Sequence, residues 1–235
     1  MRIDLNADLG ESAERWASGE DMALLKVVTS ANVCCGAYAG DDELISATCE
    51  ACVERGVAIG AQVGYPDREG FGREPMEMAP EALHDEVAGQ IAHLRDLAKA
   101  VDGRVTYVKP HGALYNTIVR DEVQAGAVVE AVRGAGLPLV GLPGAASLRL
   151  ARAAGIPVVL EGFADRGYTD EGTLIPRKEP GALIEEPSDA AVQAVRLLHD
   201  GVESICVHSD SPGALDIVRA VRVALEYAGA EVRHP

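Results

Sequence analysis

Short apolar runs recur along this chain, and each ends in polar residues or glycine before a stretch with helical spacing. Buried strands that alternate with helices at intervals of roughly thirty residues are typical of a parallel α/β sheet. No break in composition and no low-complexity linker interrupts the repeat. Residues 1–235 are therefore interpreted as one domain. The runs lie at residues 3–9, 27–36, 57–62, 105–111, 137–142, 157–165 and 204–208.

The ends of these runs help to choose between a closed barrel and an open sheet. Polar residues end nearly every run, whereas an open sheet concentrates them at one crevice. The length of 235 residues also suits a barrel of strand–helix units. The sequence therefore predicts a single-domain TIM-like (β/α) barrel in its seven-stranded variant.

Composition and charge limit the classes of partner. Hydrophobic residues make up 48% of the chain and aromatic residues only 4%, so the core is built mainly from aliphatic side chains. A net charge of −16 repels phosphate backbones and anionic lipid. Neither a nucleic acid nor a membrane is expected as a partner, and a small-molecule substrate is favoured.

Cysteine usage and the absence of targeting segments indicate the compartment. No apolar run approaches the roughly 18 residues needed to span a bilayer, and the first strand begins too early for a signal peptide. The five cysteines are an odd number, and Cys34 adjoins Cys35, which makes a poor disulfide framework. Free thiols and a cytoplasmic location are expected.

The first strand carries a row of short polar side chains. Asp4, Asn6 and Asp8 alternate with apolar residues, and Glu11 follows after a glycine turn. This row is either a solvated face with a capping turn or one wall of a site at the carboxyl ends of the strands. Other candidates that end strands in the same way are Asn32, Gln62, Asp67, Glu161 and Asp165.

The fourth run contains a lysine and a histidine two residues apart. Lys109 lies in an apolar strand, so its burial requires a carboxylate such as Asp8 or Glu161 nearby. His111 faces the same side, and Gly112 after it allows a substrate or backbone to approach closely. A histidine here is either a satisfied core group or a functional one, and the neighbouring lysine favours function.

Two charged, glycine-rich loops follow the third and sixth strands. Residues 65–78 include Arg73, and residues 165–177 end at Arg177. Each is either a solvated excursion or a lid that brings an arginine onto an anionic substrate. After the seventh strand, period-two spacing places Asp210 on the side of His208, where it is expected to orient the imidazole or bind a metal.

Several familiar catalytic signatures are missing. The chain has no Gly-x4-Gly-Lys-Ser/Thr phosphate loop, no Gly-x-Gly-x-x-Gly after the first strand and no Gly-x-Ser-x-Gly elbow. The residue pattern instead indicates acid/base or metal-assisted hydrolysis of a small polar molecule.

Five motifs in order resemble the LamB/YcsF family, the A subunits of 5-oxoprolinase. The resemblance implies a seven-stranded (β/α) barrel and ATP-dependent opening of 5-oxoproline to glutamate, with Mg2+ and partner subunits B and C. Applied to this chain, it gives Asp8, Glu11, Lys109 and His111 as catalytic residues. It gives Asn6, Asn32, Asp67, Arg73, Asn116, Glu161, Asp165, Arg177, His208 and Asp210 as substrate-binding residues. The motifs are residues 4–11, 30–36, 108–116, 161–166 and 206–210.

The sequence departs from the family pattern at two histidines. Tyr38 stands where Cys-Gly-Phe-His-Ala-Gly is usual, and Gln62 stands where Ala-His-Pro is usual. Tyrosine and glutamine hydrogen-bond but do not ligate a transition metal as imidazole does, so no firm metal site is predicted. Two alternatives therefore remain: a non-catalytic binding or regulatory homologue, and a stand-alone metal-dependent amide hydrolase. Whether ATP binds this chain or a partner also remains open.

Overall fold

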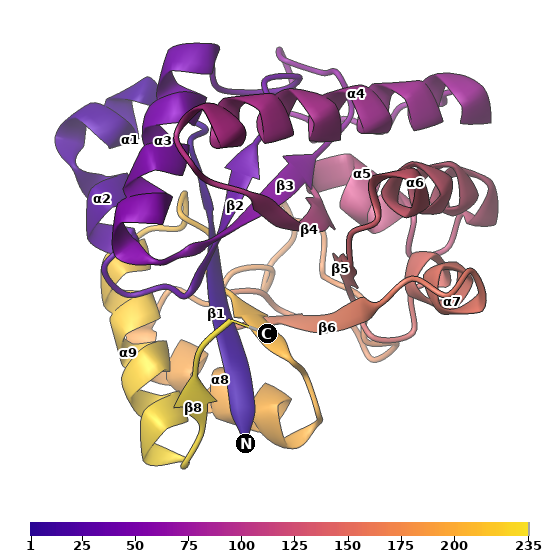
Figure 1. Ribbon diagram of the computed structural model, residues 1–235. Coiled ribbons are helices and arrows are strands. Elements are labelled where there is room, and N and C mark those ends of the chain that lie inside the picture. The colour runs from indigo at the N-terminus through magenta and orange to yellow at the C-terminus, as the bar shows by residue number, and fades with distance from the viewer. Residues whose placement is uncertain (235) are drawn as a thin grey trace.

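A closed ring of seven parallel strands forms the centre of the molecule in a computed structural model that describes residues 1–234 (Figure 1). The strand order is β2-β3-β4-β5-β6-β7-β1, and β1 pairs back to β2. The predicted seven-stranded barrel is confirmed. The strands of the ring are β1 (Arg2–Leu9), β2 (Ser30–Cys34), β3 (Ala58–Val63), β4 (Val105–Pro110), β5 (Leu139–Gly141), β6 (Val158–Phe163) and β7 (Ser204–Cys206).

Strand β1 is the longest member of the ring and contacts three neighbours. It pairs with β7 over Asp4–Asn6 and with β2 over Asn6–Leu9, which aligns Asp8 with Asn32. At its start it also pairs with the short strand β8 (Glu231–Val232), an addition that the sequence did not predict. This pairing brings the two ends of the chain together, and Arg2 hydrogen-bonds the carbonyl of His234.

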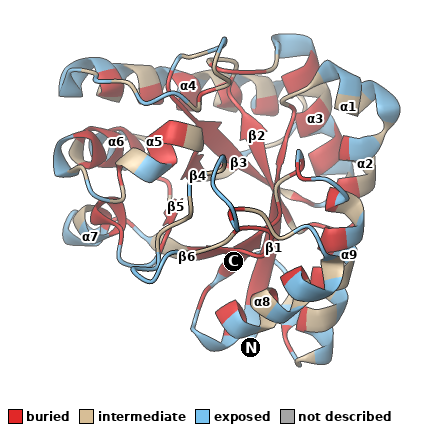
Figure 2. Cartoon of the chain, turned by 180° about the vertical axis from the view of Figure 1, so that it is seen from behind, coloured by how far each residue is buried: buried red, intermediate tan, exposed pale blue. Residues whose placement is uncertain are grey.

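Helices surround the ring, with buried residues facing the strands and exposed residues facing outward (Figure 2). In the longest helix, Leu83, Val87 and Leu94 are fully buried at helical spacing. None of the described helices combines the length and apolarity that a membrane span requires. The helices are α1 (Ala13–Ser18), α2 (Glu20–Leu24), α3 (Asp42–Arg55), α4 (Pro80–Ala100), α5 (Gly112–Thr117), α6 (Glu122–Ala135), α7 (Ala146–Ala153), α8 (Pro187–His199) and α9 (Ala214–Tyr227).

The two faces of β1 are both buried but differ in chemistry. Leu5, Ala7 and Leu9 belong to the apolar core, whereas the alternating Asp4, Asn6 and Asp8 contact polar side chains of neighbouring strands. The barrel interior is therefore polar along this strand, and the interpretation of β1 as a solvated edge is wrong. All five cysteines are free and buried, as predicted.

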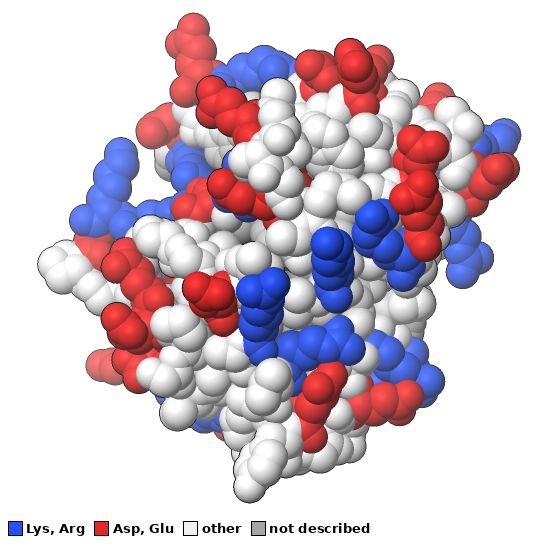
Figure 3. Space-filling view, turned by 90° about the vertical axis from the view of Figure 1, so that its left-hand side faces the viewer, with Lys and Arg blue, Asp and Glu red and all other residues white. Residues whose placement is uncertain are grey.

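Surface charge is unevenly distributed despite the acidic composition. Figure 3 shows Lys and Arg side chains gathered across the middle of one face, with Asp and Glu side chains around them. Positive potential on this chain is therefore local rather than absent.

Candidate active site

A cavity of about 850 Å³ opens at the carboxyl ends of the strands. Its wall includes Asp8 of β1, Lys109 of β4 and Phe163 of β6, together with residues of the long loops. Six lysine and arginine side chains line it, against two carboxylates, so the cavity is positive in a chain of net charge −16. The eight charged residues are Arg73, Lys109, Arg120, Arg166, Arg177, Lys178, Asp8 and Glu74.

Lys109 is buried and surrounded by acceptors. Its Nζ lies 2.8 Å from Glu161 Oε1, 3.3 Å from Asp8 Oδ1 and 3.2 Å from Asn6 Oδ1, and it also contacts the Cys206 sulfur at 3.1 Å. Burial alone would lower the pKa of Lys109, but Asp8, Cys206 and Glu161 together raise it well above its ordinary value. The lysine is therefore a permanent cation, and both predicted carboxylate partners contact it.

Asp8 has one satisfied oxygen and one open oxygen. Its Oδ1 accepts hydrogen bonds from Lys109 and, at 2.8 Å, from Asn32 Nδ2. Among residues 1–234, no hydrogen-bond donor reaches Oδ2, and Asp8 lines the cavity. Burial would raise the pKa of Asp8, but Lys109, His208 and His111 lower it to about 2. Asp8 is therefore an ionised carboxylate with a lone pair available for a ligand.

Glu11 lies beside Asp8 and has the opposite titration behaviour. Its carboxylate, that of Asp8 and a ring nitrogen of His111 lie within 4.8 Å of one another. Burial, then the charges of Asp8 and Asp210, raise the pKa of Glu11 well above its ordinary value. Two neighbouring carboxyl groups whose pKa values move apart form a pair of proton donor and acceptor.

His111 has both ring nitrogens engaged. Nε2 donates to the carbonyl of Phe71 at 3.1 Å, because a carbonyl can only accept. Nδ1 then accepts from the amide of Gln62 at 3.0 Å. Burial lowers the pKa of His111 to about 4, so the ring is neutral near pH 7. His111 reaches the predicted site, but in this arrangement its nitrogens hold the loop and Gln62.

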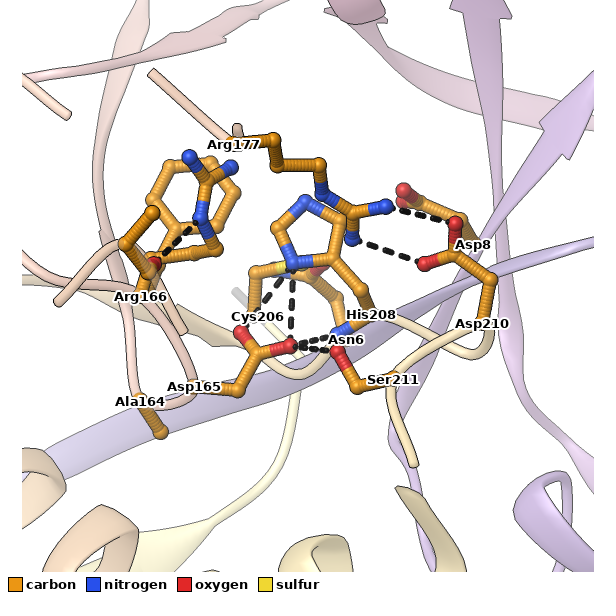
Figure 4. A network of polar contacts seen from close by, with 12 residues as sticks. Asn6, Asp8, Ala164, Asp165, Arg166, Arg177, Cys206, His208, Asp210 and Ser211 are labelled. Carbon is orange, nitrogen blue, oxygen red and sulfur yellow. Dashed lines mark hydrogen bonds and ion pairs between the residues drawn. The ribbon is translucent and has the colours of Figure 1, made fainter. Parts of the chain in front are cut away.

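His208 is oriented by Asp165 rather than by Asp210 (Figure 4). Its Nδ1 lies 3.1 Å from both carboxylate oxygens of Asp165, and Asp165 Oδ2 also accepts from Ser211 at 2.6 Å. The prediction that Asp210 orients His208 is wrong because β7 ends at Cys206, and the period-two geometry of a strand does not continue through residues 207–210. Burial opposes the shift, but His208 lowers the pKa of Asp165.

Asp210 instead joins the two long loops. Arg177 contacts it with both terminal guanidinium nitrogens, at 2.7 and 2.8 Å, and Arg73 contacts Oδ2 at 2.5 Å. Both arginines line the cavity, and Asp210 does not. We call Arg73, Arg177 and Asp210 the clasp. The two loops thus meet over one carboxylate, and that carboxylate belongs to the protein itself.

The loop of residues 65–78 is docked on the barrel through a glycine. The Ala113 N–H donates to the carbonyl of Gly72 at 2.9 Å. Gly112 has a φ of +56°, and a Cβ there would lie 2.3 Å from that carbonyl oxygen. The predicted close approach at Gly112 is therefore made by backbone, and a larger residue would push the loop away.

Two predicted substrate-binding residues have local structural contacts. Asp67 accepts from the backbone N–H groups of Gly70 and Glu74, so it shapes its own loop and does not line the cavity. Asn116 lines the cavity, while its amide donates to the Gly112 carbonyl at 3.0 Å. Of these two, only Asn116 is placed to meet a ligand.

Comparisons with known proteins identify the family of this chain. Residues 3–235 match the LamB/YcsF family. The chain belongs to the LamB/YcsF family. It is 51% identical to the 5-oxoprolinase A subunit of Streptomyces avermitilis, with 98% of each chain covered, and 50% identical to that of Paracidovorax citrulli, with 99% covered. The crystal structure of the lactam utilization protein from Thermus thermophilus superposes with a TM-score of 0.91 at 42% identity, covering 99% of each chain.

The two departures from the usual LamB/YcsF pattern lie together against His111. Tyr38 stacks on its ring, with centroids 4.1 Å apart and planes 3° from parallel, and Gln62 bonds its Nδ1. The Tyr38 hydroxyl also contacts Glu11 at 3.5 Å. Glu11 Oε1 itself lies 3.6 Å from His111 Nδ1, so the two substituted residues surround a contact between Glu11 and His111.

Two donor sets in this LamB/YcsF chain lie close enough to hold a metal ion. They are Asp8, Cys206 and His208, and Asp8, Glu11 and His111. The Lys109 ammonium contacts both Asp8 and Cys206, which opposes a cation in the first set. In the second set, the free lone pair of His111 already accepts from Gln62. The residues therefore fit a metal poorly.

Two tyrosines of the site were not predicted. The Tyr107 hydroxyl donates to Asn32 Oδ1 at 2.7 Å and so fixes the amide that holds Asp8. Its position two residues before Lys109 was a usable signal, because both share one face of β4. Tyr115 lines the cavity, and its buried hydroxyl lies beside the carboxylate of Glu161. No strand pattern marks Tyr115, since it lies on α5.

Proposed function

We propose that this chain is the A subunit of an ATP-dependent 5-oxoprolinase, which opens the lactam of 5-oxoproline to L-glutamate together with subunits B and C. The observation that carries the proposal is the pair of Asp8 and Glu11, whose pKa values are shifted in opposite directions beside a cationic cavity. Family membership and full-length relatives that are named as A subunits of 5-oxoprolinase support it. Five buried free thiols suit the reducing cytoplasm, where we place the reaction.

The residues of the cavity suit the two demands of lactam opening. The ring carbonyl is a poor electrophile. Phosphorylation of its oxygen by ATP, which releases ADP, makes the ring carbon electrophilic enough for water to add to it. The C–N bond then breaks to leave an acyl phosphate, and a second water hydrolyses this to the carboxylate and phosphate. The open Oδ2 of Asp8 accepts the ring N–H, and Lys109 fixes Asp8 in place. As the ring opens, its nitrogen must gain a proton, which Glu11 supplies by way of the adjacent Asp8. Catalysis by Lys109 and His111 is thus mainly positioning.

ATP and its Mg2+ are assigned to the partner subunits in this proposal. The chain has no glycine-rich phosphate loop, and the charge of Lys109 is balanced by Asp8 and Glu161. In this proposal the cationic side chains of the cavity wall, in particular Arg166 and Lys178, stabilise the transferred phosphoryl group. This division explains how a cavity without nucleotide motifs takes part in an ATP-dependent reaction.

The test is glutamate release from 5-oxoproline and ATP by this chain mixed with its B and C subunits. We expect Asp8→Asn to reduce kcat by at least about 100-fold, because the substitution keeps the shape but removes the acceptor charge. Asp4→Asn is the matched control, since Asp4 lies on the same face of β1 but outside the cavity. The control should stay within about threefold of the parent chain. Equal rates for the two variants would contradict the assignment.

A non-catalytic binding homologue is the second candidate, and the stacking of Tyr38 on His111 favours it. In that case 5-oxoproline would raise the melting temperature of the chain, but the three-subunit mixture would release no glutamate. Turnover above that of Asp8→Asn would exclude this candidate.

A further inference from the structure

Asp210 is held in the manner of a bound ligand. Arg177 binds it in a bidentate manner, with Nη1 on Oδ2 at 2.7 Å and Nη2 on Oδ1 at 2.8 Å (Figure 4). Arg73 adds a third contact, to Oδ2. This is the geometry in which arginine recognises carboxylates in general. The carboxylate binder is therefore already built, and it is occupied by a side chain of the same protein.

The clasp carries more positive than negative charge. Two guanidinium groups face the single carboxylate of Asp210. Arg166 also lines the cavity, and its own contacts are neutral carbonyls, those of Ala182 at 3.0 Å and Ile175 at 2.6 Å. The surplus charge favours a second anion at this wall of the cavity.

The position of the clasp links it to the acid/base pair. Arg73 and Arg177 line the same cavity as Asp8, whereas Asp210 lies outside the wall with 29% of its side chain exposed. Asp210 is therefore within reach of water, and it can turn outward when a substrate carboxylate takes its place on the two arginines, which stay in the cavity. Stacking over Phe71, 5.0 Å from the ring centroid, keeps Arg73 in place without Asp210.

We propose that Arg73 and Arg177 form the subsite for the carboxylate of the substrate, and that Asp210 occupies this subsite until the substrate displaces it. The ligand class is a small cyclic amide with a ring carboxylate, and the choice of 5-oxoproline within that class rests on the proposed function. Asp210 lowers the apparent affinity for the substrate, because only the molecules in which the two arginines are free can bind the substrate carboxylate. It also keeps two cationic loops together in the absence of ligand.

Calorimetry on the full chain with two ligands tests the subsite. 5-Oxoproline and 2-pyrrolidinone share the lactam ring, but only 5-oxoproline has the carboxylate. We expect the chain to prefer 5-oxoproline by at least about tenfold, and Arg177→Gln or Arg73→Gln to remove most of that preference. Asp210→Asn should tighten 5-oxoproline by about threefold to tenfold and leave 2-pyrrolidinone unchanged, because the competitor is gone.

The sign of the Asp210→Asn effect decides between a competitor and a structural support. If Asp210 only supports the loops, its loss weakens both ligands equally, and that result would overturn the inference. Asp216→Asn is the matched control, since Asp216 is an exposed aspartate paired with Arg219 at 3.8 Å outside the cavity. It should change neither affinity.

Failure of this inference is distinguishable from failure of the proposed function. If the three-subunit mixture releases no glutamate, yet Asp210→Asn tightens 5-oxoproline alone, the subsite stands and the 5-oxoprolinase assignment fails. If turnover is normal but the two arginine variants keep the full preference for 5-oxoproline, the subsite is wrong and the reaction stands.

Discussion

Asp4 and Asp8 lie on the same face of the same strand, yet the barrel gives them opposite chemistry. Both side chains are buried. Asp4 accepts hydrogen bonds from the hydroxyls of Thr29, Ser30 and Ser204, and burial raises its pKa. Asp8 contacts the ammonium of Lys109, and its pKa falls to about 2 in spite of burial. Their pKa values differ because Asp8 has a cation beside it, since both residues are buried aspartates.

The two ends of the barrel differ in the same way. At the Asp4 end, hydroxyls satisfy the carboxylate, and Asp4 does not line the cavity. At the Asp8 end, one oxygen is left open beside a cationic cavity. The same row of polar residues is therefore a structural support at one end and a candidate for chemistry at the other.

Removing the cation should have the largest effect on stability. Lys109→Met leaves Asp8 and Glu161 buried without a counter-charge, which we expect to lower the free energy of unfolding by about 3–5 kcal/mol at pH 8. Without the ammonium, burial raises the pKa of both carboxyls in the folded state. The folded state of the variant is then favoured at low pH and loses stability as the pH rises.

Urea denaturation at pH 5 and pH 8 measures this prediction. The loss in free energy of unfolding caused by Lys109→Met should be smaller at pH 5 than at pH 8. Lys99→Met, at an exposed position of α4, should cost little at either pH. A deficit that is the same at both pH values would show that the carboxylates do not respond to the lost cation.

We expect Asp8→Asn and Asp4→Asn to change the pH dependence of the free energy of unfolding in opposite directions. Because the pKa of Asp8 is about 2 instead of its ordinary 3.8, its ionised form stabilises the fold above pH 4 by about 2 kcal/mol. That contribution is lost as the pH falls toward 2. The pKa of Asp4 is raised, so its contribution is present below 3.8 and is lost as the pH rises.

Guanidinium denaturation between pH 3 and pH 7 distinguishes the two. The free energy of unfolding of the parent chain should exceed that of Asp8→Asn by an amount that grows with pH. Its excess over that of Asp4→Asn should shrink as the pH rises. Parallel slopes for both variants would mean that Lys109 does not set the difference between the two aspartates.

The smallest expected effect concerns the support behind Asp8. Tyr107→Phe removes the hydroxyl that donates to Asn32 at 2.7 Å, and we expect a loss of about 1 kcal/mol in the free energy of unfolding. Tyr227→Phe, at a tyrosine that is 95% exposed, serves as the control in the same denaturation experiment. If the free energy of unfolding of Tyr107→Phe equals that of the parent chain, the hydrogen bond from Tyr107 to Asn32 does not stabilise the fold.

Strand periodicity predicted much of the candidate site and failed where the strands end. The alternation of β1 and β4 correctly placed Asp8 and Lys109 on the interior face. The same rule was wrong for Asp210, because the chain leaves the strand after Cys206 and turns. The partner of His208 is instead Asp165, which lies 43 residues earlier in the sequence.

The sequence by itself determined the seven strand–helix units, the polar face of β1 and the need of a buried Lys109 for carboxylate partners. These follow from local periodicity and from the cost of burying a charge. Only the tertiary structure decided that Asp4 meets hydroxyls while Asp8 meets an ammonium, and that Asp210 holds two arginines from separate loops. Those pairings join residues far apart in the chain, so ring closure and loop packing set them, and local sequence rules do not reach that far.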